Sequence, residues 1–171
     1  MIQGRDRFTI HTGKDAFAMR ILFVCHGNIC RSPMAEFVMK QLVEEAGLAD
    51  QFEIASAATS TEEIGNGVYP PVRRLLLRHG IDPAGKTARQ MRRSDYDSYD
   101  LLIGMDGENI RNMRRICGGD PAGKIRLLLD DAQAPRDISD PWYTRDFDRT
   151  WRDVQEGCRA LLAYLTQRKG C

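Results

Sequence analysis

Residues 21–33 read ILFVCHGNICRSP, which places an apolar run, a tight turn and the beginning of a helical pattern in direct succession. Ile21 to Cys25 is a short unbroken apolar run, as expected of a strand buried on both faces of a parallel sheet. Pro33 fits the first position of a helix, with Ser32 as its N-cap. The stretch therefore predicts a strand, a loop and a helix N-terminus, with two cysteines and an arginine between them.

The rest of the chain alternates predicted strands with predicted helices. Behind Pro33, apolar residues recur at helical spacing as far as Gly47, and Glu36, Lys40 and Glu44 form charge pairs on the opposite face. Apolar runs predict further strands over residues 52–57, 101–105 and 125–129, and periodic patterns predict helices over residues 72–79, 94–99, 108–117 and 147–165. This alternation predicts an α/β fold with a single doubly wound domain and helices on both faces of a parallel sheet.

The composition excludes several classes of protein. Lys and Arg number 25 against 24 acidic residues, a net charge of +1, so no overall field attracts nucleic acid or a membrane surface, and neither is expected as a partner. Residues 1–18 lack the continuous apolar stretch of a signal peptide and are interpreted as an appendage to a domain over residues 19–171. Five cysteines at irregular spacing form no disulfide framework, which favours a cytoplasmic protein with reduced thiols.

The loop after Ile21–Cys25 lies where ligands bind in a doubly wound sheet, beyond the carboxyl end of a strand. A zinc site could use Cys25 and Cys30, but zinc sites have close ligand pairs and this chain has no second pair. The remaining cysteines and the histidines are scattered: Cys117, Cys158, Cys171, His11, His26 and His79. The sequence therefore predicts no metal and no other cofactor.

A phosphate-binding loop explains these residues better. A strand, a tight loop and a helix N-terminus supply converging backbone N–H groups and the positive end of a helix dipole. The forked guanidinium of Arg31 could hold two phosphoryl oxygens, and Asn28 tolerates the left-handed backbone that would turn the N–H groups inward. The same positive field would lower the pKa of the Cys25 thiol from about 8.5 toward the thiolate range. Ser32 could donate a hydrogen bond to that sulfur.

The stretch from Cys25 to Pro33 resembles the signature loop of the low-molecular-weight protein tyrosine phosphatases, and the resemblance extends over about residues 20–165. Further matching segments are Ser56-Ala57-Ala58-Thr59-Ser60, Arg78-His79-Gly80-Ile81, Ala88-Arg89-Gln90, Met105-Asp106 and Asp140-Pro141-Trp142-Tyr143. The resemblance implies a four-stranded parallel sheet and a two-step hydrolysis of phosphotyrosine in proteins. Cys25 would attack phosphorus, Arg31 would clamp the phosphoryl group, and water would then hydrolyse the cysteinyl-phosphate.

The resemblance makes Asp140 the general acid for the tyrosine leaving group and the base for the attacking water. Because a tyrosine hydroxyl has a pKa near 10, its protonation in the transition state accelerates the reaction by about 10² to 10⁴-fold. Alone, Asp-Pro is ordinary turn chemistry. Trp142 and Tyr143 would form an aromatic wall for the substrate ring or pack as a hydrophobic latch on the last helix. The expected contacts of phosphate or another oxyanion in the loop are His26, Gly27, Asn28, Ile29, Cys30 and Ser32.

Two other functions remain open from the sequence. The loop also resembles that of thioredoxin-coupled arsenate reductases, but the close cysteine pair of their disulfide relay looks absent, and a catalytically silent phosphate-binding module is the other alternative. Cys30 could trap an oxidised Cys25 as a protective disulfide or simply pack beneath the loop. After Ser60, where relatives often carry a second aromatic residue, this chain has Thr61-Glu62-Glu63, which would disfavour acidic phosphopeptides.

Overall fold

Four parallel strands form one sheet in the computed structural model, which describes residues 18–167. β1 (Met19–Cys25) lies inside the sheet, with β2 (Phe52–Ala58) on one side and β3 (Leu101–Gly104) on the other. β4 (Ile125–Leu127) pairs with β3, which gives the strand order β2-β1-β3-β4. The predicted four-stranded, doubly wound α/β fold is confirmed, and the carboxyl ends of all four strands meet at one edge.

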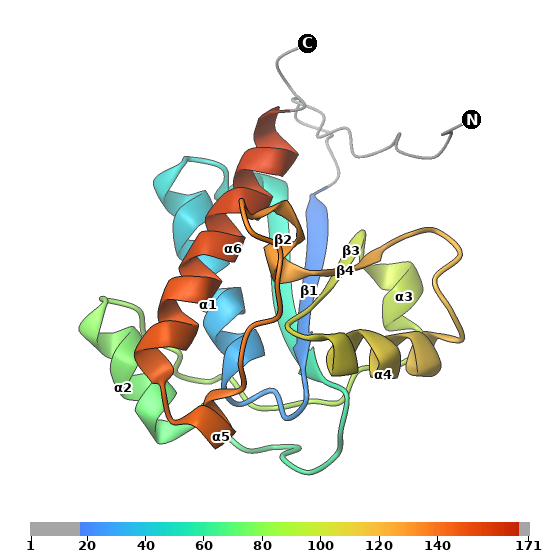
Figure 1. Ribbon diagram of the computed structural model, residues 1–171. Helices are drawn as coiled ribbons and strands as arrows, with labels where there is room; N and C mark the ends of the chain where they lie inside the picture. The colour runs from blue at the N-terminus through green and yellow to red at the C-terminus, as the bar shows by residue number, and fades with distance from the viewer. Residues whose placement is uncertain (1–17, 168–171) are drawn as a thin grey trace.

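Helices cover both faces of this sheet (Figure 1). α1 (Arg31–Glu45), α2 (Pro70–Arg78) and the long α6 (Phe147–Gln167) lie on one side. α3 (Asp95–Ser98) and α4 (Gly107–Cys117) lie on the other. The remaining helical segments are short: η1 (Ala49–Gln51), η2 (Leu128–Asp131) and α5 (Pro141–Thr144). α5 lies beside the loop that follows β1, at the lower end of the molecule in Figure 1.

The alternation of side chains along β1 divides the core into two layers. Ile21, Phe23 and Cys25 face the layer formed with α1, α2 and α6, whereas Leu22 and Val24 face the layer formed with α4. Successive side chains of a strand point to opposite faces, and both faces of this sheet are covered, so β1 is apolar from Ile21 to Cys25 and its one charged residue, Arg20, lies near its start. This is why the run before the loop contains no polar residue.

The structure corrects two predicted helix and strand boundaries. α1 begins at Arg31, with Cys30 rather than Ser32 at the N-cap position, because the Cys30 carbonyl already accepts the Met34 amide at 3.1 Å. The prediction of Ser32 as N-cap was therefore wrong. The predicted strand over residues 125–129 ends at Leu127. Leu128 turns instead into the core against Gly157 of α6, where an added Cβ would lie 2.6 Å from the leucine Cγ.

The predicted polar face of α1 is only partly correct. Lys40 pairs with Glu36 at 2.6 Å, as its four-residue spacing indicated, but Glu36 is buried against β2. Among residues 18–167, none of the helices has both the length and the apolar character required to cross a membrane. The predicted appendage lies outside the described residues except for its last position, and the cytoplasmic location stays a prediction.

Candidate active site

The loop between β1 and α1 curves around the sulfur of Cys25. Asn28 holds the left-handed backbone conformation predicted for it, with φ of 58°, and its side chain is buried behind the loop. The side-chain nitrogen of Asn28, Nδ2, donates to Ser32 Oγ at 2.8 Å and to Ser56 Oγ at 2.9 Å. Its side-chain oxygen, Oδ1, accepts the backbone amide of Arg89 at 3.2 Å. Three contacts to three separate segments therefore fix the residue that turns the loop.

The direction of each hydrogen bond in this network follows from a buried carboxylate. Glu36 accepts from the Ser56 hydroxyl at 2.5 Å, so the Ser56 oxygen remains to accept from Asn28. Asn28 spends its second N–H on the oxygen of Ser32. The hydroxyl hydrogen of Ser32 can then be donated to Cys25 Sγ at 3.0 Å or to the Ala57 carbonyl at 3.4 Å. Glu36 thus orients the donors behind the loop, and the last of them lies beside the cysteine sulfur.

The charge of Glu36 is balanced by two lysines. Lys40 Nζ lies 2.6 Å from one carboxylate oxygen, and Lys86 Nζ lies 3.3 Å from the other while donating to the Ser56 carbonyl at 2.9 Å. Burial lowers the pKa of Lys86, and the nearby Glu36 carboxylate opposes that shift. Neither Glu36 nor Lys86 was predicted as part of the site, because the two residues lie far apart in the sequence and no local pattern indicates that they form an ion pair.

The sulfur of Cys25 is positioned to accept hydrogen bonds. Besides the hydroxyl contact, the Ser32 backbone amide donates to Sγ at 3.4 Å, at the first turn of α1. Cys25 is 3 % exposed and lies at the base of the loop. A thiolate at this point is therefore approached by an amide and a hydroxyl from the same serine, which explains why Ser32 is not used as the helix cap.

Arg31 points from the first turn of α1 toward two acidic loops. Its Nη1 donates to Asp106 Oδ2 at 2.6 Å and to the Ile138 carbonyl at 2.9 Å, and its Nη2 lies 3.3 Å from Asp140 Oδ2. Burial alone would lower the pKa of Arg31, but the charges of Cys25, Asp106 and Asp140 outweigh it, and the pKa is raised. The guanidinium therefore stays charged beside the cysteine, and none of these contacts uses its Nε.

Asp106 is a site residue to which the sequence patterns gave no role. Its Oδ1 caps α4 by accepting the Asn109 amide at 2.8 Å, and its Oδ2 holds Arg31. The residue follows β3, which neighbours β1, so its position at the carboxyl edge of a parallel sheet was the signal that could have identified it. One carboxylate thus fixes both a helix end and the arginine of the loop.

Asp140 reaches the same point from the segment after η2. It is the N-cap of α5, where its Oδ1 accepts the Trp142 amide at 3.0 Å and its Oδ2 faces Arg31. Asp140 therefore acts as a turn residue through Oδ1 and also lies beside the Cys25 loop, where Oδ2 contacts Arg31. The structure brings Cys25, Arg31 and Asp140 together from three segments of the chain.

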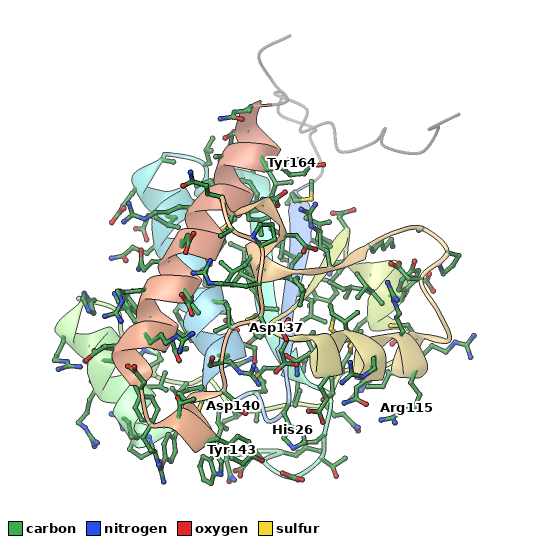
Figure 2. The ribbon with its side chains drawn as sticks, in the orientation of Figure 1. His26, Arg115, Asp137, Asp140, Tyr143 and Tyr164 are labelled. Atoms are coloured by element: carbon green, nitrogen blue, oxygen red, sulfur yellow. The ribbon has the colours of Figure 1, made fainter. Side chains whose placement is uncertain are left out.

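A cleft of about 290 Å³ opens above Cys25 and contains most of the predicted contacts. Figure 2 shows His26, Asp140 and Tyr143 gathered at one end of the molecule, with Tyr164 at the other end. The predicted residues that line the cleft are Cys25, His26, Gly27, Ile29, Cys30, Arg31, Asp140, Trp142 and Tyr143. The side chains of Asn28 and Ser32 are buried behind the loop, where Asn28 donates a hydrogen bond to Ser32.

The rim of the cleft carries both aromatic and acidic side chains. Tyr143 is 81 % exposed, whereas Trp142 packs against the ring of Tyr69, with centroids 5.1 Å apart. Glu62 and Glu63 also line the cleft, and Glu62 Oε2 lies 3.0 Å from His26 Nε2. The loop after Ser60 therefore brings two carboxylates to the cleft.

The cysteines of residues 18–167 are all free thiols. Burial and the neighbouring Cys25 raise the pKa of Cys30, and burial raises the pKa of Cys158 and Cys117. Cys158 lies in the core layer with α1 and α6, whereas Cys117 lies in the layer on the other face of the sheet. The two thiols that a relay would need are therefore separated by the sheet.

Comparisons with known proteins agree with this geometry. The family model described as low molecular weight phosphotyrosine protein phosphatase matches residues 20–170. The low molecular weight protein-tyrosine-phosphatase YfkJ of Bacillus subtilis is 38 % identical over 151 residues, which are 87 % of this chain and 97 % of that protein. The low molecular weight phosphotyrosine protein phosphatase of Pongo abelii is 38 % identical over 150 residues, covering 83 % of this chain and 92 % of its own.

Solved structures give the same result for the fold. The crystal structure of YfkJ from Bacillus subtilis superposes with a TM-score of 0.85 at 36 % identity, covering 92 % of this chain and 99 % of that one. The similarity includes the segment that carries Cys25 and the segment that carries Asp140, since the family match spans both. The chain belongs to the low-molecular-weight phosphotyrosine protein phosphatase family, and the predicted enzyme class, a protein tyrosine phosphatase, is confirmed.

Proposed function

We propose that this protein hydrolyses phosphotyrosine in protein substrates through a cysteinyl-phosphate intermediate. The observation that carries the proposal is the convergence of Cys25, Arg31 and Asp140 on one cleft, from β1, the first turn of α1 and the N-cap of α5. A nucleophile, a cation for the phosphoryl oxygens and a proton donor are the three groups that transfer of a phosphoryl group from an aryl ester needs.

In the first step, the Cys25 thiolate attacks phosphorus and the bond between phosphorus and the phenolic oxygen breaks. Asp140 gives its proton to that oxygen, so tyrosine leaves as a neutral phenol. Arg31 neutralises charge on the equatorial oxygens, together with the inward N–H groups of the loop and the N-terminus of α1. The product of this step is a phosphate ester of the cysteine sulfur.

In the second step, water attacks the phosphorus of the cysteinyl-phosphate and transfers a proton to Asp140. The sulfur–phosphorus bond breaks, inorganic phosphate leaves and the thiolate is restored. Ser32 supports this step because its hydroxyl lies 3.0 Å from the sulfur that must accept negative charge. Phosphate and related oxyanions would bind in the same loop as product or inhibitor, and no metal or other cofactor enters either step.

The rim of the cleft supports a preference among phosphopeptides. Glu62 and Glu63 both face the entrance, and Glu63 packs over the loop, with its Cγ 3.4 Å from the Cβ position that a substitution at Gly27 would occupy. Carboxylates next to the bound phosphotyrosine would repel acidic flanking residues. We therefore expect poor hydrolysis of acidic phosphopeptides, with Trp142 and Tyr143 contacting the substrate ring.

Hydrolysis of an aryl phosphate in the presence of EDTA tests the function. Wild type is expected to release phosphate over repeated turnovers through a phosphoenzyme that rapid quenching can trap, and Cys25→Ser is expected to release none. Asp140→Asn should slow phosphotyrosine more than an activated aryl phosphate, whose leaving group needs no proton. Binding of phosphate with no turnover would favour a silent module. Thioredoxin-dependent arsenate turnover would favour a reductase, for which the separation of Cys117 and Cys158 gives no support.

A further inference from the structure

Tyr69 touches both of the loops that build the cleft, although it does not line the cleft itself. Its backbone amide donates to the Ile29 carbonyl at 2.9 Å, and Ile29 belongs to the loop around Cys25. Tyr69 directly precedes α2 and is followed by Pro70 and Pro71, whose fixed backbone angles hold its main chain in place. The backbone of Tyr69 is thus attached to the phosphate-binding loop.

The side chain of Tyr69 reaches the segment that carries Asp140. Its ring lies 5.1 Å from the Trp142 ring at an angle of 56° and 6.1 Å from the Phe147 ring. Its hydroxyl accepts a hydrogen bond from Arg145 Nη1 at 2.9 Å, and the Arg145 guanidinium also lies 5.6 Å from the centre of the Trp142 ring. Trp142, Arg145 and Phe147, which all follow Asp140 in the chain, therefore contact the side chain of Tyr69.

These contacts continue to the carboxylate of Asp140. The Trp142 amide donates to Asp140 Oδ1 at 3.0 Å, so the placement of Trp142 also decides how the carboxylate is oriented. At the other end of α5, Arg145 has a φ of 58°, a left-handed conformation that residues other than glycine rarely adopt. The bond from Arg145 to Tyr69 secures this turn, which ends α5 just after the aromatic pair.

We propose that Tyr69 is a positioning residue that holds the Asp140 turn against the phosphate-binding loop. The proposal rests on the proposed acid role of Asp140. Tyr69 contacts no reacting atom, so the effect of its side chain on the first step passes through Trp142 and Arg145 to the turn that carries Asp140. Loss of the ring would free Trp142, and with it the carboxylate that must lie within hydrogen-bond reach of the leaving oxygen.

The leaving group is the readout that separates this role from a general loss of structure. Values of kcat/KM report the first chemical step, and they depend on the acid only when the leaving group needs a proton. We would measure kcat/KM for phosphotyrosine, 4-nitrophenyl phosphate and 2,4-dinitrophenyl phosphate, whose leaving groups decrease in basicity in that order. A misplaced acid steepens the dependence on leaving-group pKa, whereas a smaller fraction of folded enzyme lowers all three values equally.

Tyr69→Ala is expected to lower kcat/KM for phosphotyrosine by about 10-fold or more, and for the dinitrophenyl ester by less than about two-fold. Tyr69→Phe retains the ring and loses only the bond to Arg145. Arg145→Gly removes the same bond and suits the left-handed backbone. Each should give a small steepening, with Arg145→Gly the larger because it also removes the contact of the guanidinium with the Trp142 ring. The double variant should be no worse than Arg145→Gly alone, because the two substitutions share one hydrogen bond.

Tyr164→Ala is the matched control. Tyr164 is also a half-buried tyrosine next to an arginine, with Arg126 lying 5.0 Å from its ring, but it lies at the far end of the molecule (Figure 2). Its loss should lower stability without changing the leaving-group dependence. The proposal is overturned if Tyr69→Ala lowers all three kcat/KM values equally, or if Tyr164→Ala steepens the dependence as much as Tyr69→Ala does.

Asp140→Asn shows which of the two proposals has failed. If this variant has the same leaving-group dependence as wild type, Asp140 is not the acid, and both the acid role and the role of Tyr69 are wrong. If Asp140→Asn is steep and Tyr69→Ala is not, the acid role holds and only the positioning role of Tyr69 is excluded. If Tyr69→Ala does not fold, the leaving-group dependence of Tyr69→Phe and Arg145→Gly is compared with that of Asp140→Asn in the same way.

Discussion

The guanidinium of Arg31 and the carboxylate of Asp106 lie 2.6 Å apart from Nη1 to Oδ2, and the other oxygen of the same carboxylate caps α4. The pair joins the loop after β1 to the loop after β3, two segments 75 positions apart in the chain. Because Arg31 is buried and charged, its orientation depends on such fixed acceptors rather than on water.

Asp106→Asn is expected to lower kcat/KM for aryl phosphates by about 10- to 100-fold, because the arginine loses the charge that orients it. Asparagine can still accept the Asn109 amide, so the helix cap is retained. Steady-state kinetics and the inhibition constant of inorganic phosphate measure the effect. Asp106→Ala removes the cap as well and should cost about 1 kcal/mol of additional stability. Equal stability of the two variants would argue against the double role of this carboxylate.

Ser32→Ala is expected to lower kcat more than kcat/KM. In the proposed mechanism, the hydroxyl 3.0 Å from Cys25 Sγ would stabilise the sulfur when it leaves phosphorus in the second step. Loss of one such donor costs about 10- to 1000-fold in rate. Rapid mixing with an aryl phosphate should therefore show a larger burst of phenol followed by slow turnover. The control is Ser98→Ala, which removes an exposed hydroxyl bonded to the Ser94 carbonyl. A variant of Ser32 without a burst would contradict this role.

Glu36→Gln is expected to destabilise the protein by about 2 to 3 kcal/mol in urea unfolding, because it leaves the Lys86 ammonium buried without a counter-charge. The side chain of Lys86 is only 14 % exposed. Lys40 donates to the same carboxylate, but its side chain is 45 % exposed, so Lys40→Met should cost less than about 1 kcal/mol. If both substitutions cost the same, burial is not the reason for the effect.

The stability of Glu36→Gln should also recover at alkaline pH. Burial lowers the pKa of Lys86 in the folded protein below its ordinary value in the unfolded chain. Between these two pKa values the unfolded chain binds more protons, so stability from this group rises with pH. Without Glu36 the folded pKa falls further and the rise begins at lower pH. A deficit relative to wild type that is constant from pH 7 to pH 10 would contradict this account.

Among the four cysteines of residues 18–167, alkylation at neutral pH should select Cys25. Burial raises the pKa of Cys30, Cys158 and Cys117, so these three thiols stay protonated and react slowly with iodoacetamide. Peptide mapping by mass spectrometry should find the modification at Cys25, and inorganic phosphate should protect it. Denatured protein, in which every thiol is exposed, is the control. Modification of Cys30 as fast as that of Cys25 would contradict the assignment of the nucleophile.

Local sequence determined the parts of this protein that depend on neighbours in the chain. The apolar run Ile21–Cys25 had to be a central strand, since both sheet faces are covered. The residues from Cys25 to Arg31 follow it at a helix N-terminus, so a tight loop leading into a helix was predictable. Asp140 was predictable as a turn residue beside a helix start, and the resemblance of its segment to the family implied an acid role for it. Such features need only periodicity, turn chemistry and the order of elements.

The tertiary structure decided the contacts that join distant segments. The strand order β2-β1-β3-β4 places Asp106 beside Arg31 and brings Ser56 and Glu36 to the back of the loop. The sequence predicted Glu36 on the polar face of α1 and Ser32 as a helix cap. The local sequence around each residue is the same whether or not another strand packs against it. Contacts between segments far apart in the chain depend on how the complete sheet is packed. A local sequence pattern does not specify which distant segment will pack against it.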